Sequence, residues 1–83
     1  MSIILYPVTN EKAIGLMETQ NTLTFAVDGK ATKPQIKKEA EALFQVKVAS
    51  VNTMISPQGR KRAYVRLAKG FKADDVASKL KIV

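Results

Sequence analysis

The sequence contains no cysteine and no histidine. Without cysteine, the chain can form no disulfide bond, no thiolate zinc site and no thiol nucleophile. Without histidine, it lacks the commonest transition-metal ligand and the only side chain that titrates near neutral pH without perturbation. An enzyme made of these residues would need a serine, threonine or lysine nucleophile with an unusual base. The composition therefore predicts a protein that is not an enzyme and carries no metal.

Long hydrophobic runs are also absent. The longest early run, residues 3–5, is far too short for a signal-peptide core or a membrane span. We therefore expect a cytoplasmic protein without a membrane partner. The 83 residues, 46% hydrophobic and 25% charged, are typical of one ordinary globular domain over residues 1–83. Because no Gly-rich phosphate loop is present either, we expect neither a cofactor nor a small-molecule substrate.

Acidic residues are missing from a long stretch of the second half. No Asp or Glu occurs between Glu41 and Asp74, whereas seven Lys and Arg residues do. Residues 1–45 contain five basic and five acidic residues, and residues 46–83 contain nine and two, so the net charge of +7 lies wholly in the second half. Such a concentration of like charge repels itself unless a polyanion neutralises it. We interpret the second half as polyanion-binding, in preference to a basic face kept only for solubility.

The hydrophobic periodicity predicts seven elements in the order β-α-β-α-β-β-α. A short strand over residues 3–6 precedes a helix that Thr9 or Asn10 caps and that ends near Glu18. The alternation over residues 22–27 predicts a half-buried strand with one apolar face.

The clearest helix signal follows a turn over residues 28–30. Thr32 and Gln35 have the spacing of a capping box at the start of this helix. An apolar stripe at helical spacing then predicts its core-facing side, which consists of Ile36, Ala40, Leu43 and Phe44.

The last third predicts a hairpin and a final helix. Strands over residues 46–55 and 62–68 flank a turn at 56–59, and a phase slip predicts a bulge near Ala49 or Ser50. The final helix begins at Asp74-Asp75 and packs Val76 and Leu80 on the core. The whole pattern predicts an α+β domain, with a small antiparallel sheet of three to four strands packed with helices.

The returning strand of this hairpin carries the strongest functional signal. Arg62, Tyr64 and Arg66 are two residues apart, so all three project from one face of the strand. Arginine forks bind phosphate oxygens, and a tyrosine between them can stack on an exposed base or bond a ribose hydroxyl. Arg60 and Lys61 extend this stripe into the turn. The alternative is an edge strand whose charges block aggregation, but the acid-free stretch favours binding to an RNA or DNA backbone.

Two weaker candidates lie elsewhere. Lys33, next to Thr32 at a helix N-terminus, suits a phosphate, although a capped helix explains the same residues. Asn52 and Thr53 lie in the bulged strand, where they either reach nucleic acid or face water.

Several segments together resemble the large-subunit ribosomal protein L23 family. They share its order and spacing from about residue 3 to the C-terminus. The matching stretches are Tyr6-Pro7-Val8-Thr9-Asn10-Glu11-Lys12-Ala13, Asn21-Thr22-Leu23-Thr24-Phe25, Ala31-Thr32-Lys33, Leu43-Phe44-Gln45-Val46-Lys47-Val48, Val51-Asn52-Thr53 and Arg62-Ala63-Tyr64-Val65-Arg66-Leu67.

The resemblance implies a structural constituent of the large ribosomal subunit that binds large-subunit rRNA near the polypeptide exit tunnel. It also implies neighbouring large-subunit proteins as partners, and a docking surface for factors such as trigger factor or the signal recognition particle. The docking glutamate of the family falls on Glu11. Bacterial members carry a long basic loop where residues 56–62 here make a tight connection. This connection looks like the archaeal form and favours the signal recognition particle, or a neighbouring ribosomal protein, at Glu11.

The residues and the resemblance together assign RNA binding to fourteen positions. These are Thr9, Lys12, Asn21, Thr22, Lys33, Lys47, Asn52, Thr53, Arg60, Lys61, Arg62, Tyr64, Arg66 and Lys69.

Three alternatives to a ribosomal protein stay open at this point. A free-standing RRM-like RNA-binding module would explain part of the stretch from Arg60 to Leu67, but two of its aromatic positions hold Arg62 and Leu67, and no final strand follows the last helix. A small acylphosphatase-like enzyme would need an arginine near the N-terminus, and the first arginine is Arg60. A protein-only adaptor would leave the acid-free stretch without a role.

Overall fold

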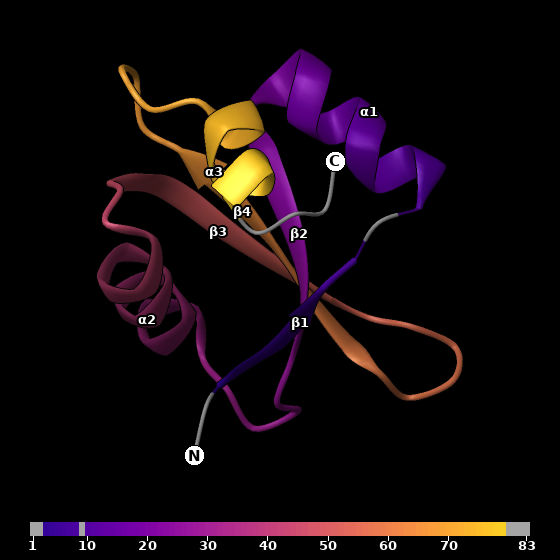
Figure 1. Ribbon diagram of the computed structural model, residues 1–83. Coiled ribbons are helices and arrows are strands. Elements are labelled where there is room, and N and C mark those ends of the chain that lie inside the picture. The colour runs from indigo at the N-terminus through magenta and orange to yellow at the C-terminus, as the bar shows by residue number, and fades with distance from the viewer. Residues whose placement is uncertain (1–2, 9, 80–83) are drawn as a thin grey trace.

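The computed structural model describes residues 3–8 and 10–79, and its elements follow the predicted order. Thr9 and Leu80, named above, lie outside these residues. The strands form one antiparallel sheet in the order β1-β2-β4-β3, and the helices pack around it (Figure 1). The bounds are β1 Ile4–Pro7, α1 Glu11–Gln20, β2 Thr22–Val27, α2 Lys33–Phe44, β3 Val48–Ile55, β4 Lys61–Leu67 and α3 Ala73–Lys79. The predicted α+β class is confirmed.

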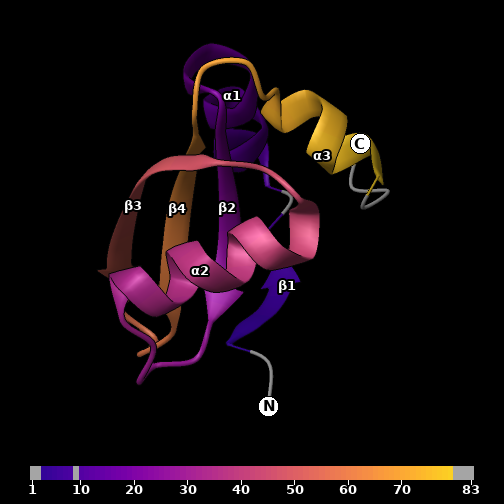
Figure 2. The ribbon, with the colours of Figure 1, turned by 90° about the vertical axis from the view of Figure 1, so that its left-hand side faces the viewer.

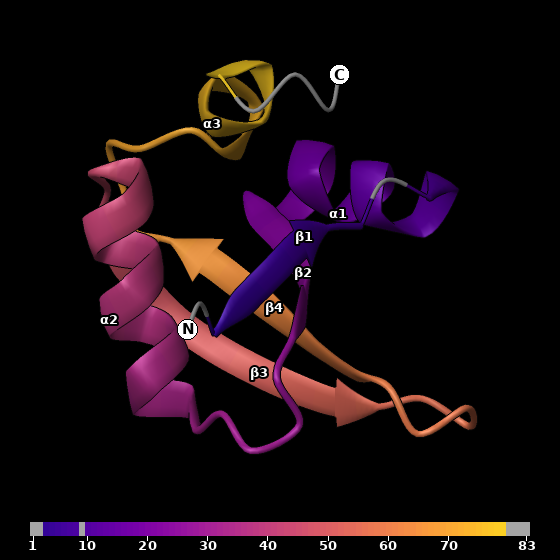
Figure 3. The ribbon, with the colours of Figure 1, turned by 60° about the horizontal axis from the view of Figure 1, so that its bottom comes forward.

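The hydrophobic core lies on one face of the sheet. Helix α2 runs across this face and α3 lies at its end (Figure 2), whereas α1 lies on the other side of the sheet from α2 (Figure 3). Phe25, Ile36 and Val65 are the largest fully buried side chains. The ring of Phe44 stacks on Phe25 with centroids 5.2 Å apart, so the core contact predicted for α2 is confirmed at this position.

Two asparagines set the bounds of α1. The side chain of Asn10 accepts a hydrogen bond from the backbone N–H of Ala13 at 2.8 Å, which confirms one of the two predicted caps. The helix continues past the predicted end at Glu18 to Gln20. It ends there because Asn21 adopts the left-handed conformation, with φ 52°, and returns its N–H to the Leu16 carbonyl. The cap sets the helix end, and the low helix propensity of Gly15 does not.

Helix α2 is tied to both edges of the sheet by its own carboxylates. Glu39 accepts from the backbone N–H of Ile4 in β1 at 2.6 Å, and Glu41 accepts from Val48 in β3 at 3.0 Å. The predicted capping box of this helix is present. Leu43, predicted in the core stripe, is 56% exposed. It lies only about 20° around the helix from the fully buried Ile36 but almost two turns further along, next to the C-terminal end of α2, so position along the helix and not the side of the helix exposes it.

Two predictions about the strands are corrected by the sheet order. Strand β2 was expected to be half-buried, but all six of its residues are buried, because it is an inner strand with α1 packed against its second face. Strand β4 is also an inner strand, between β2 and β3. The edge-strand explanation for its arginines is therefore wrong.

The hairpin has the predicted bulge and turn. The register of β3 against β4 shifts between Val48 and Ser50. At the turn, Ser56 donates to the Arg60 carbonyl at 2.7 Å, and Gly59 has a positive φ of 79°. Strand β3 begins at Val48, two residues later than expected. None of the helices in the described part of the chain is long and apolar enough to cross a membrane.

Candidate nucleic-acid interface

The face of the sheet opposite α2 gathers the functional residues predicted on β4. Directly opposed residues of antiparallel strands share a face, so the register defines three rows across β3, β4 and β2. We call these nine residues the open face: Ser50, Arg66 and Thr22 in one row, Asn52, Tyr64 and Thr24 in the next, and Met54, Arg62 and Ala26 in the third. The expectation that Arg62, Tyr64 and Arg66 share one face is confirmed.

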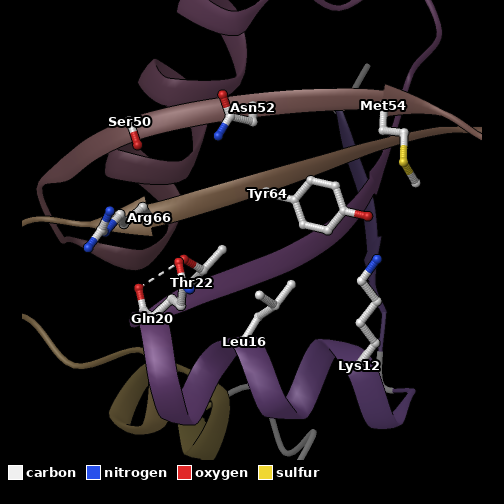
Figure 4. A pocket seen from close by; sticks show the side chains of 9 residues that line it. All are labelled: Lys12, Leu16, Gln20, Thr22, Ser50, Asn52, Met54, Tyr64 and Arg66. Atoms are coloured by element: carbon white, nitrogen blue, oxygen red, sulfur yellow. Dashed lines mark hydrogen bonds between the residues drawn. The ribbon is translucent and has the colours of Figure 1, made fainter.

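Helix α1 and the open face enclose a hollow of about 300 Å³. The α1 side is a single row of residues four apart, which places them on one helix face. The sheet side comes from all three strands of the open face. The lining residues, shown in Figure 4, are Lys12, Leu16 and Gln20 from α1, and Thr22, Ser50, Asn52, Met54, Tyr64 and Arg66 from the sheet. The structure thus brings together five of the residues assigned to RNA binding: Lys12, Thr22, Asn52, Tyr64 and Arg66.

The hollow is electrostatically one-sided. Its charged residues, among those the structure describes, are Lys12 and Arg66, and both are exposed. The acids of the same helix point elsewhere: at 100° per residue, Glu11 and Glu18 lie roughly 100° and 120° around α1 from Lys12. Helix α1 therefore presents a cationic side to the open face and an acidic side away from it.

Other assigned residues serve the fold. Asn21 donates from its side-chain amide to the Phe71 carbonyl and accepts from the Ala73 N–H, both at 2.6 Å. The Lys61 ammonium donates to the Ala31 carbonyl at 2.7 Å. Each of these contacts joins segments far apart in the sequence, so both side chains are engaged inside the molecule.

The remaining assigned residues lie around the sheet rather than on the open face. Lys33 begins α2, across the sheet. Thr53 pairs with buried Ala63 and so faces the α2 side. Lys47 and Lys69 are exposed in the connections before β3 and after β4, and Arg60 is exposed at the opposite end of the hairpin.

Sequence reasoning missed four residues of the hollow. They are Leu16 and Gln20 on α1, and Ser50 and Met54 on β3. The i, i+4, i+8 spacing of residues 12, 16 and 20 was a usable signal for the helix. The alternation of side chains in β3 was not a usable signal. The sequence left the position of the bulge open between two residues, and a bulge changes which side chains point to which face.

The described residues hold no group of three acidic side chains that could bind a metal. The chemistry of this surface is therefore that of two arginines, a lysine, a tyrosine ring and neutral polar groups.

Comparison with known proteins gives a consistent result. Residues 2–75 match the family described as Ribosomal protein L23. The chain is 49% identical over 81 residues to the protein named Large ribosomal subunit protein uL23 of Trypanosoma brucei brucei. The alignment covers 98% of this chain and 49% of that protein, so the chain spans about half the length of the curated relative it matches.

Proposed function

The chain belongs to the Ribosomal protein L23 family, and from this premise we propose that it is a non-enzymatic constituent of the large ribosomal subunit in the cytoplasm. In this proposal it binds large-subunit rRNA near the polypeptide exit tunnel, beside neighbouring large-subunit proteins. The open face is the main contact with the RNA.

The observation that carries this proposal is the position of Arg62, Tyr64 and Arg66. These three residues occupy the middle of the open face, on an inner strand. Inner strands need no charge to block edge-to-edge pairing, and the side chains form no ion pair with a carboxylate among the described residues. Arg66 is exposed and Arg62 is half-buried, and arginines that the fold does not pair are suited to phosphate oxygens.

The number of phosphates follows from the placement of the cations. Lys12, Arg62 and Arg66 flank or occupy the open face, and Arg60 extends it at the hairpin. Four contacts predict that log affinity falls against log salt with a slope of about −3.6, at ~0.9 per phosphate.

Salt titration of binding to a large-subunit rRNA transcript tests this count. Arg66→Ala should flatten the slope by about 0.9, whereas Lys33→Ala, across the sheet, should leave it unchanged. A flat response of the parent protein, or equal effects of the two variants, would contradict binding through the open face.

Membership of the large subunit has its own test. The tagged protein, expressed in cells, should sediment with the large subunit and remain there through a high-salt wash. Recovery in the ribosome-free fraction would favour the second candidate, a free-standing RRM-like module.

One observation supports that candidate: β2-α2-β3-β4-α3 follows a β-α-β-β-α order, and β1 beside β2 fills the place of the fourth strand. The fourth strand of the sheet thus comes from the N-terminal part of the chain, so a strand after the last helix is not needed for a sheet of this order, and family membership is what favours the ribosome.

We further propose that Glu11 contributes to the docking of a nascent-chain factor, such as the signal recognition particle, or of a neighbouring protein. Glu11 is exposed in the first turn of α1, outside the hollow. Glu11→Ala should weaken factor binding to ribosomes and spare rRNA affinity, with Glu18→Ala as the matched control on the same helix. Loss of rRNA affinity in Glu11→Ala would refute this division.

The short turn of the hairpin at Ser56–Arg60 is present. That the chain is the archaeal form of the family stays a prediction.

A further inference from the structure

The hollow between α1 and the open face has a shape that a basic sheet surface alone would lack. We propose that it takes one unpaired rRNA nucleotide, splayed out of its helix, with the base against Tyr64 and the two flanking phosphates at Lys12 and Arg66. This inference rests on the proposed rRNA binding and adds a defined base pocket to it.

The middle of the hollow suits a flat, largely apolar ring. Tyr64 lies at its centre on the sheet side, and Leu16 faces it from α1 (Figure 4). Both side chains are only half-buried, so each keeps surface that a ligand can cover. Unpaired bases in RNA are bound by stacking on aromatic side chains. A volume of about 300 Å³ is at the small end for ligand sites and cannot admit a duplex.

The walls supply groups that can recognise a base edge. Asn52 neighbours Tyr64 across the strands, and Ser50 and Gln20 lie toward the Arg66 end (Figure 4). Within the described residues, none of these three side chains is engaged in a hydrogen bond. Amide side chains offer a donor and an acceptor together, the combination that matches the edge of a base. Thr22 is different, because its hydroxyl already donates to the Gln20 carbonyl at 2.9 Å.

The two cations lie at opposite ends of the hollow. Arg66 is in the row of Ser50 and Thr22, near Gln20, whereas Lys12 lies two helical turns away, near Met54 (Figure 4). Lys12 and Gln20 are eight residues apart, about 12 Å along the helix at 1.5 Å per residue. One base between two cations is the arrangement of a nucleotide with a phosphate on each side. A peptide carboxylate would need only one of these cations and would leave the ring without a stacking partner.

Ultraviolet crosslinking of the protein to a large-subunit rRNA transcript, read by mass spectrometry, tests the base contact. We expect a crosslinked nucleotide on Tyr64. Tyr64→Leu should lower rRNA affinity by about tenfold, the loss of one stacked base, without changing the salt slope. Tyr64→Phe should retain the affinity because the ring is kept. Asn52→Ala, at an exposed position, should keep the fold and reduce discrimination among the four bases at the crosslinked position.

Arg62→Ala is the matched control, because Arg62 shares the open face but does not line the hollow. It should flatten the salt slope and preserve the Tyr64 crosslink. Thermal melting of each variant shows whether it is folded. If the parent binds with a steep salt slope while folded Tyr64→Leu binds equally well, or if Tyr64→Phe loses as much affinity as Tyr64→Leu, the base pocket is wrong and the proposed function stands. If the parent does not bind rRNA, or binds without salt dependence, the proposed function itself fails.

Discussion

The sequence predicts that Asn21 binds RNA, whereas the structure gives it a role in the fold. Replacing Asn21 distinguishes these two roles. Asn21 joins α1 to β2 in the left-handed conformation, with φ 52° and ψ 38°. Its side chain bonds the Phe71 carbonyl and the Ala73 N–H, both at 2.6 Å, fifty residues and more along the chain. We expect Asn21→Gly and Asn21→Ala to destabilise the fold, with the alanine variant affected more.

The magnitudes follow from the two losses. Glycine keeps the left-handed backbone but removes two side-chain hydrogen bonds, each with a net value of about 1 kcal/mol. Ala73 is fully buried, and an N–H left without a partner there costs about 1–3 kcal/mol. With about 1 kcal/mol for the bond to Phe71 and about 1–3 kcal/mol for the Ala73 N–H, Asn21→Gly should therefore lose about 2–4 kcal/mol. Asn21→Ala adds the left-handed penalty of a Cβ, about 1 kcal/mol or slightly more.

Urea denaturation followed by circular dichroism measures these differences directly. A loss of 2 kcal/mol should also lower Tm by roughly 8–16 °C in a domain of this size. Under conditions where both variants remain folded, rRNA affinity should change less than in Arg66→Ala. If Asn21→Gly has parental stability but reduced rRNA affinity, the reasoning fails and Asn21 is an RNA contact.

Three further substitutions test single features of the fold. Lys61→Met should lose about 1 kcal/mol of stability with its bond to the Ala31 carbonyl, yet leave the salt slope of rRNA binding unchanged; a flatter slope would show that the ammonium contacts phosphate. Phe44→Ala should lose about 3 kcal/mol in urea denaturation, because it removes the ring stacked on Phe25, and a loss below 1 kcal/mol would contradict this packing. Gly59→Ala should lose about 1 kcal/mol through its positive φ alone, since a Cβ there meets no atom within 4 Å; unchanged stability would show that the turn relaxes.

The elements of this fold were predictable because their signals are local. The cap at Asn10, the capping box at Thr32 and the turn at Ser56–Arg60 each depend on residues within a few positions of one another. The alternation in β4 likewise sets which side chains share a face. Each of these predictions needed no knowledge of neighbouring elements.

The errors arose where the answer depends on which strand lies beside which. Strand β2 looked half-buried because its threonines are polar, and its inner position with α1 on the second face buries Thr22 and Thr24 as well. The arginines of β4 were compatible with an edge strand for the same reason. Leu43 shows a smaller form of this error, since helical spacing defines a stripe but not where the sheet beneath it stops.

Counting the basic residues of the second half overestimates the number of cations that can contact RNA at one surface. Sequence position places Lys61 beside Arg62, but successive strand residues point to opposite faces. Lys61 accordingly bonds a carbonyl on the α2 side while Arg62 lies on the open face. Conversely, the hollow beside the open face gains Lys12 from a half of the chain with no net charge. Phosphate binding depends on how many cations reach one surface, and that number is set by strand parity and by the position of α1. The slope of log affinity against log salt consequently reports how many cations the fold places on one surface. The net charge of +7 does not report that number.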